Sequence, residues 1–390
     1  MSAGAESNAA LSGTLAEILS ARLHARPVQP NLLPAVDDLA AWQDLIKLAH
    51  SERVSPLVYL ALKDRDVCPP AVMDQLKGAY YEVTRYNLLL GRALAEILRA
   101  LHAAGVEVIV LKGMALMESL YRNPGLRPVT DMDILIHAAD VPAALDALQG
   151  IGWTPTADTE PFLGAEEDHR TEMALQNPRM MTLLDLHWGL LKSWYYKRNI
   201  RPSDLWDSAR PLPERGEGAR QLGLETGLVF LGAHWFRHDE QELLWLYDIA
   251  LTVTAPAEEI DWQRVLACTR DWGLVLSMRA ALGRAAAVLG APVPVEVTRA
   301  LSRMRPSLGE WITYYAFVEG RAPSAVRNLA FMFQRRGWLS RVKYILAKLF
   351  PPAEYMIERY HIRHRWLLPL HYPYRIIAGL WRKSSPRKPA

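Results

Sequence analysis

The segment that most constrains the fold is residues 106–136, where two apolar runs flank a short helix-like segment and a turn. Residues 106–111 are nearly continuous in β-forming side chains, and residues 114–121 then suit a helix. A Pro-Gly turn follows before the second apolar run, residues 132–136. This order predicts a strand–helix–strand unit, with a first strand that is covered on both faces.

Charged residues stand at both ends of this unit. Asp131 and Asp133 open the second strand, and strand alternation turns their side chains to the same face. Two like charges held so close repel each other unless a cation lies between them. Lys112 and Gly113 end the first strand, and a strand–glycine–helix turn offers backbone N–H groups to a phosphate. Metal and phosphate chemistry is therefore the leading interpretation.

A third strand is expected over residues 180–188, and it carries Asp185 and His187 on one face. Two divalent ions about 3.5–4 Å apart need bridging carboxylates and phosphate oxygens. Asp185 is therefore a third candidate metal ligand beside Asp131 and Asp133. A lone histidine is more often packed or hydrogen-bonded than catalytic, so we interpret His187 as structural.

The remainder reads as mainly helical: residues 80–104 have apolar side chains at helical spacing and stop at Gly105, and residues 140–150 form a shorter helix. The predicted fold class is α+β, with a small mixed-sheet core embedded in a largely helical protein. Four regions are expected: an N-terminal helical region 1–104, an α/β core 105–200, a helical cleft region 201–320 and a basic helical tail 321–390. His234 and Asp248 lie in apolar surroundings, where they either pair with each other or face the cleft.

The formal net charge of +3 conceals an asymmetry. Residues 321–390 hold fifteen Lys/Arg and two Glu, whereas acids outnumber bases in the rest of the chain. This tail mixes aromatic, aliphatic and basic side chains, which suits an anionic surface, a protein partner or a plain basic face. No sequence-specific DNA-binding module is recognisable.

The compartment follows from what the sequence lacks. Cys68 and Cys268 have no metal-type spacing, which favours a reducing compartment. The N-terminal segment has no signal-peptide pattern, and no apolar run reaches the roughly 18–20 residues of a membrane span. We expect a cytoplasmic protein, at most peripheral to the inner face of the membrane.

Four motifs in order carry a resemblance to a known group of proteins: Leu111-Lys112-Gly113, Arg127, Asp131-Met132-Asp133 and Asp185-Leu186-His187-Trp188. They resemble the nucleotidyltransferase superfamily that includes polymerase beta, and more closely the bacterial group known as nucleotidyltransferase family proteins. Many members of that group are uncharacterised. Superfamily members often carry Gly-Ser at the turn, where this chain has Gly113-Met114, so a hydroxyl contact to the triphosphate is absent.

The resemblance implies a role for each residue. Asp131 and Asp133 would hold one Mg²⁺, and Asp185 would join them at a second and orient the attacking hydroxyl. Lys112, Gly113 and Arg127 would contact the nucleoside triphosphate, with ATP as the expected donor. The acceptor would be a hydroxyl of a small molecule, peptide or protein, and pyrophosphate would leave.

Two alternatives remain open for this site. One is phosphoryl transfer or nucleotide hydrolysis by the same residues, for which ADP rather than pyrophosphate is the expected kinase product. The other is a non-catalytic nucleotide-binding accessory protein of a biosynthetic cluster. Neither the acceptor nor the oligomeric state follows from the sequence.

Overall fold

The structure is a computed structural model that describes residues 3–156, 171–180, 182–191, 193–216, 218–237, 243–254, 260–315, 338–351, 353–360 and 362–381. The chain forms two compact units. The first consists of Met1–Thr159 and Thr171–Arg321, and the second of Glu160–Arg170 and Ala322–Ala390.

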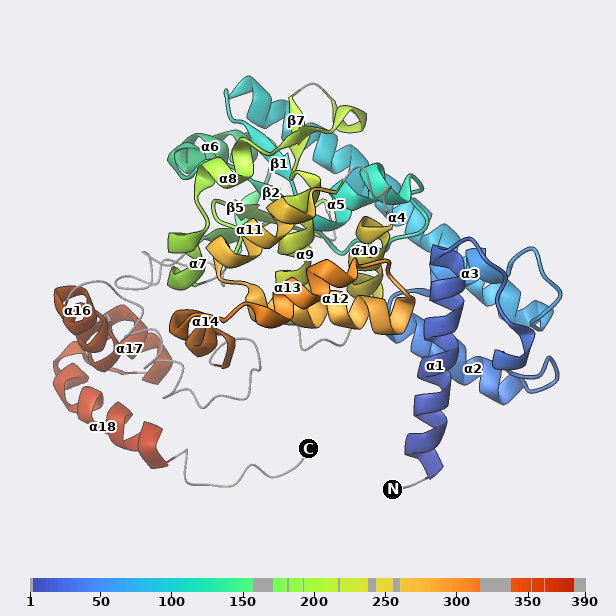
Figure 1. Ribbon diagram of the computed structural model, residues 1–390. Coiled ribbons are helices and arrows are strands. Elements are labelled where there is room, and N and C mark those ends of the chain that lie inside the picture. Colours follow the sequence, from blue (N-terminus) through green and yellow to red (C-terminus); the bar gives the residue numbers. More distant parts are fainter. Residues whose placement is uncertain are drawn as a thin grey trace. The chain divides into compact units, whose positions relative to one another are not determined.

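A seven-stranded mixed sheet lies within the first unit, in the order β3-β4-β5-β2-β1-β7-β6. Figure 1 labels four of these strands, β5, β2, β1 and β7. Its strands are β1 Val108–Val110, β2 Asp131–Leu135, β3 Thr154–Pro155, β4 Glu172–Gln176, β5 Leu183–His187, β6 Arg210–Pro211 and β7 Ala219–Gln221. Strand β2 runs parallel to β5 and antiparallel to β1, and β1 runs parallel to β7. The predicted mixed-sheet α+β class is confirmed.

The three strands predicted from the sequence are β1, β2 and β5. The other four lie in stretches for which the sequence predicted no strand. Strands β3, β6 and β7 are two or three residues long and include polar side chains, so no local alternation marks them. Their strand conformation depends on pairing with distant partners, such as Ala219 with Val108.

Helices make up most of the first unit: α1 Ala3–Leu23, α2 Leu39–Ser51, α3 Ser55–Leu62, α4 Pro70–Ala103, α5 Lys112–Leu116, α6 Val141–Gly150, α7 Trp194–Asn199, α8 Pro202–Trp206, α9 Leu224–Arg237, α10 Leu243–Val253, α11 Trp262–Trp272, α12 Val275–Leu289, α13 Val295–Arg303 and α14 Leu308–Thr313. The helix expected after β1 is α5 followed by a π-helix, η2 Met117–Tyr121. Helix α4 starts earlier than expected, with Pro70 in its first turn, a position that tolerates proline.

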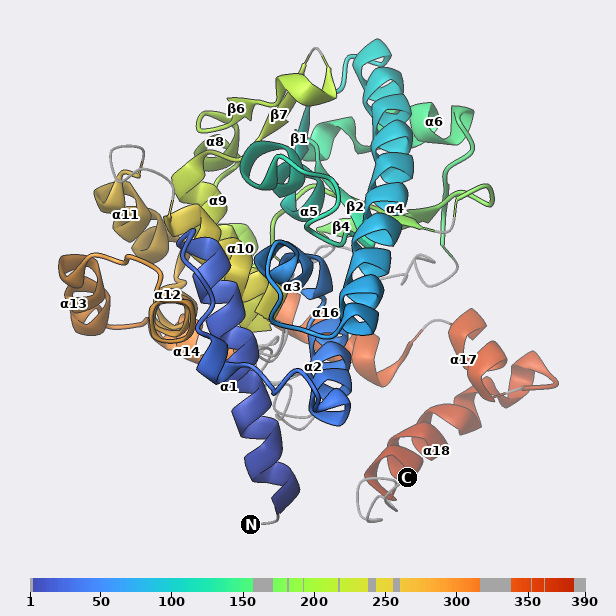
Figure 2. The same cartoon turned by 90° about the vertical axis from the view of Figure 1, so that its right-hand side faces the viewer.

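Helices pack on both faces of the sheet, as the apolar composition of the first strand predicts. Val108 and Val110 belong to one buried cluster, to which α4 and α6 contribute leucines and alanines. Ile109 and Leu111 point the other way, into a cluster built largely from α1, α9, α10 and α12. Figure 2 shows α4 running along the sheet.

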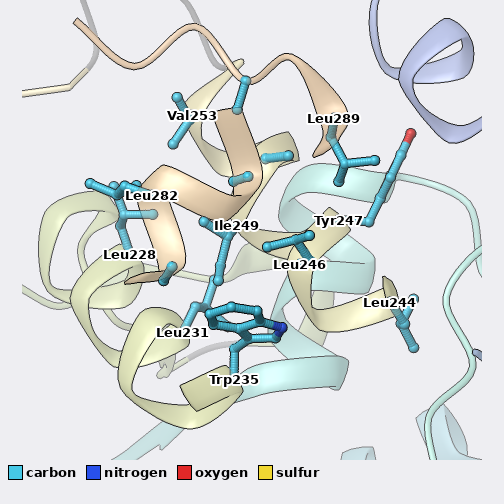
Figure 3. Packing of buried hydrophobic residues seen from close by; sticks show 14 of the residues in the cluster. Leu228, Leu231, Trp235, Leu244, Leu246, Tyr247, Ile249, Val253, Leu282 and Leu289 are labelled. Carbon is cyan, nitrogen blue, oxygen red and sulfur yellow. The ribbon is translucent and has the colours of Figure 1, made fainter. Parts of the chain in front are cut away.

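The packing of α9, α10 and α12 fixes the helices nearest to the functional side chains. Figure 3 shows Leu228, Leu231 and Trp235 of α9 packed with Ile249 of α10 and Leu282 of α12. Burial of each such side chain contributes about 1.5–3 kcal/mol to folding. This packing holds α9 and α10 against each other within the first unit.

The second unit contains α16 Trp338–Leu349, α17 Ala353–Tyr360 and α18 Leu368–Trp381. Its described contacts include the ring pairs Phe350–Tyr372 and Tyr360–Tyr374, and Met356 is fully buried. Among the described helices of the whole chain, none combines the length and the hydropathy that crossing a membrane requires.

Candidate active site

The register between β2 and β5 brings two acids together. Asp133 lies directly opposite Asp185 in this parallel pair, and His187 lies two residues further along β5. One ligand atom from each of these three residues can be chosen so that all lie within 4.8 Å of one another. Carboxylate oxygens and an imidazole nitrogen so close together form a site able to hold a metal ion.

Lys112 brings a positive charge to this cluster. Its Nζ donates a hydrogen bond to Asp133 Oδ1 at 2.6 Å. The backbone of Lys112 has a φ of 45°, in the left-handed region, where a non-glycine residue is uncommon. That turn directs the lysine from the end of β1 back toward β2, so its ammonium lies where a bound cation would neutralise the acids.

His187 contacts the acid of β2. Its Nε2 lies 3.0 Å from Asp133 Oδ1, and its Nδ1 lies 3.5 Å from Glu172 Oε2 on the neighbouring strand β4. The sequence interpretation as a hydrogen-bonded histidine therefore fits, but the structure also makes His187 a member of the acidic cluster. Its place depends on pairing with β4, a strand that the sequence analysis did not identify.

The pKa values of the two facing carboxyls are shifted in opposite directions. Burial alone would raise the pKa of Asp133, but the charge of Lys112 and the hydrogen bond with His187 outweigh it and hold that pKa well below its usual range. Burial, and then repulsion by Asp133, raise the pKa of Asp185 to about 6. A pair of close carboxyls with separated pKa values is typical of acid–base sites.

Asp131 lies at the start of β2, next to this cluster rather than within it. Its side chain is half-buried and accepts a hydrogen bond from Thr130 Oγ1 at 3.0 Å. Its negative charge contributes to the raised pKa of Asp185. The structure thus groups Asp133 with Asp185 most tightly and places Asp131 at their side.

The six residues expected to hold metal or triphosphate all line one cavity of about 180 Å³, here called the acidic cavity. Its lining includes Lys112, Gly113, Arg127, Asp131, Asp133, Asp185 and His187, together with Glu172, Phe230, His234 and Trp245. His234 and Trp245 come from α9 and α10, with ring centroids 4.8 Å apart. Of the two positions considered for His234, the structure shows the one that faces the cleft.

Arg127 lies beneath the Lys112–Gly113 turn and pairs with Asp248 of α10. The Arg127 Nη2 to Asp248 Oδ2 distance is 2.7 Å, and both side chains are buried. Tyr121 donates a further hydrogen bond to Asp248 Oδ1 at 2.7 Å. The partners of Asp248 are therefore Arg127 and Tyr121, and no local sequence pattern indicated either contact.

Gly113 is required by this arrangement. A Cβ at position 113 would lie 2.4 Å from Arg127 Nη1 and 3.1 Å from Val129 Cγ2. Both distances are shorter than ordinary carbon contacts, so a larger residue displaces the guanidinium or the turn. Asn87 supports the same region from α4 by donating hydrogen bonds to the carbonyls of Pro124 and Arg127.

A comparison with known protein families shows to which family this chain is related. The family model described as "Uncharacterised nucleotidyltransferase" matches residues 38–290. The chain belongs to this nucleotidyltransferase family. Searches of curated proteins and of solved structures gave no match.

The match to the nucleotidyltransferase family covers the whole site. It begins at the cap of α2 and ends just after α12, so it includes all seven strands and the α9–α10 pair. The resemblance drawn from the four motifs is confirmed. In a nucleotidyltransferase, acids at a strand edge beside a glycine turn have the chemistry to bind a nucleoside triphosphate with a divalent metal.

Proposed function

We propose that the protein transfers a nucleoside monophosphate from ATP to a hydroxyl group, in a reaction that depends on Mg²⁺ and releases pyrophosphate. The observation that carries this proposal is Asp133 opposite Asp185, beside the Lys112–Gly113 turn in one cavity. Family membership supports the reaction class. The acceptor is a small molecule, a peptide or a protein.

The residues present fit Mg²⁺. Asp133 and Asp185 offer hard carboxylate oxygens, and Asp131 adds a third carboxylate at the edge of the acidic cavity. His187, hydrogen-bonded to Asp133, would orient that carboxylate. When bound, two Mg²⁺ ions would neutralise the triphosphate and lower the pKa of the acceptor hydroxyl.

The turn would bind the donor. Gly113 would let the backbone approach a phosphate closely, and the first N–H groups of α5 would donate to its oxygens. Once the acids are neutralised by Mg²⁺, the ammonium of Lys112 would leave Asp133 and contact a phosphate oxygen. Arg127, fixed by Asp248, would add positive charge beneath the same turn.

Asp185 would serve the acceptor. Its carboxylate lies opposite Asp133 and lines the acidic cavity, where it would orient the acceptor hydroxyl and accept its proton. The acceptor oxygen then bonds to the α-phosphorus as the bond to the bridging oxygen breaks, and pyrophosphate leaves. Positioning and charge neutralisation supply most of the acceleration in such transfers.

The test is a panel of unfolding curves with ATP, GTP, CTP and UTP, each with and without Mg²⁺. A ligand at about a hundred times its Kd adds roughly 2.7 kcal/mol to stability. We expect a Mg²⁺-dependent shift with ATP, lost in the variant Asp131→Ala/Asp133→Ala. No shift with any triphosphate would refute donor binding, and release of ADP instead of pyrophosphate would indicate a kinase or a hydrolase.

For the second unit we propose contact with an anionic lipid surface. Large apolar side chains are exposed along α16 at helical spacing, including Trp338, Leu339, Val342 and Leu346. The surrounding sequence is strongly basic. An exposed apolar stripe with cationic neighbours suits a helix that lies in the membrane–water interface.

A further inference from the structure

A second cavity of about 180 Å³ adjoins the acidic cavity. It lies between α5 with η2 on one side and α9 on the other, and we call it the interhelical cavity. Its lining includes Ala115 and Leu116 of α5 and Gly227 and Leu231 of α9. Lys112 and Phe230 line both cavities, so these two residues form the boundary between them.

We propose that the interhelical cavity holds the nucleobase of the triphosphate donor. This inference rests on the proposed function, because it assigns one part of that donor to a further subsite. The acidic cavity would then hold only the phosphates and the reacting oxygens. A single nucleotide would extend past Lys112 and Phe230 from one cavity into the other.

The order of the strands favours the donor over the acceptor as the occupant. Asp185 on β5, Asp133 on β2, Lys112 after β1 and Gln221 on β7 follow one another across the same edge of the sheet. The acceptor hydroxyl must reach Asp185, on the β5 side. The phosphates lie at the turn after β1, so the rest of the donor extends toward β7, where the interhelical cavity lies.

The walls of the interhelical cavity suit a planar, uncharged ring. Most of its lining is apolar, with Phe230 as its one aromatic ring among the described residues. Ser119 and Thr252 add hydroxyls, and the polar side chains of Lys112, Arg210 and Gln221 also belong to the lining. Bases bind proteins by stacking on apolar and aromatic faces, with few polar contacts.

Gly227 keeps this cavity open. It lies inside α9, where glycine is less favourable than alanine. A Cβ at this position would meet only Leu222 Cβ within 4 Å, at an ordinary contact distance of 3.7 Å. The backbone therefore tolerates a side chain at position 227, and a large one would extend into the space that the base is proposed to occupy.

The experiment measures the affinities of MgATP and of magnesium tripolyphosphate by calorimetric titration of the full chain. The variants are Gly227→Leu, which fills the cavity from α9, and Leu116→Phe, which fills it from α5. Gly227→Ala is the matched control, because its single methyl fits. We expect Gly227→Leu to weaken MgATP binding by roughly tenfold or more while tripolyphosphate binding is unchanged.

Each result has a distinct meaning. Unchanged MgATP affinity in both filled variants would overturn the base subsite, while Mg²⁺-dependent ATP binding by the wild type would leave the proposed function standing. Equal loss of ATP and tripolyphosphate in both filled variants would also overturn it, because the effect would not concern the base. Failure of the wild type to bind either ligand would refute the proposed function itself.

Discussion

Arg127 and Asp248 lie 121 residues apart in the chain and form a buried ion pair, in which Nε and Nη2 of the arginine donate to both carboxylate oxygens. The pair joins the segment before β2 to α10. Because Arg127 also lies against Gly113, the helical half of the first unit is tied to the turn that is proposed to bind phosphate.

Breaking this pair should destabilise the protein strongly. Asp248→Asn leaves the Arg127 charge buried without a counter-charge, and such a loss costs about 3–5 kcal/mol. Urea unfolding of both proteins measures the difference. The matched control is Asp44→Asn, which breaks the exposed Lys47–Asp44 pair and should change stability by less than about 1 kcal/mol. Similar small effects in both variants would contradict the buried geometry.

Gly113→Ala tests the close approach at the turn. The added methyl would lie 2.4 Å from Arg127 Nη1, so we expect lower stability and weaker triphosphate binding. The control is Gly78→Ala in α4, where no atom lies within 4 Å of the added carbon. Alanine there should stabilise the helix by about 0.5–1 kcal/mol. A Gly113→Ala protein with wild-type stability and affinity would show that the turn does not need glycine.

Replacing the two facing acids by asparagine should change the stability of the protein in opposite directions. Burial and the charge of Asp133 raise the pKa of Asp185 from 3.8 to about 6 in the folded protein, so folding favours its protonated form. The free energy of unfolding therefore falls as pH rises from 3.8 to about 6, where this carboxyl loses its proton. Asp185→Asn should therefore stabilise the metal-free protein at pH 7.5. Urea unfolding at pH 4.5 and 7.5 measures this, and a less stable Asp185→Asn protein at pH 7.5 would contradict the repulsion.

Asp133→Asn is the counterpart. The pKa of Asp133 is lowered, so its stabilising contribution is present above its ordinary pKa and disappears only at strongly acidic pH. The amide that this substitution introduces carries no charge, so Lys112 would lose its ion-pair partner. We therefore expect a loss of stability at pH 7.5. If both substitutions changed stability in the same direction, the separation of the two pKa values would be wrong.

The second unit can be tested with vesicles. The full chain should sediment with vesicles that contain anionic lipid and not with neutral ones, and added salt should weaken the binding. Leu346→Glu should reduce it by placing a negative charge on the exposed face of α16. Leu308→Glu, at another exposed leucine in the first unit, is the control. Equal binding to neutral vesicles, or no effect of Leu346→Glu, would contradict the proposal.

The sequence predicted the centre of the sheet because β1, β2 and β5 are short apolar runs bounded by charged or turn residues. It did not predict β4, β6 or β7, whose strand conformation depends on partners far away in the chain. The same limit applies to the site. Asp133 and Asp185 stand at recognisable strand positions, whereas the contact of Asp248 with Arg127 exists only once α10 packs against the turn.

The central claim is that these acids hold the divalent ions of a nucleotidyltransferase. The most direct measurement is the number of Mn²⁺ ions bound per chain, read from the electron paramagnetic resonance signal of free Mn²⁺ with a non-hydrolysable ATP analogue present. We predict about two ions for the wild type and fewer for Asp185→Asn and for Asp133→Asn. Absence of bound Mn²⁺ in the wild type, or equal binding by all three proteins, would contradict the account.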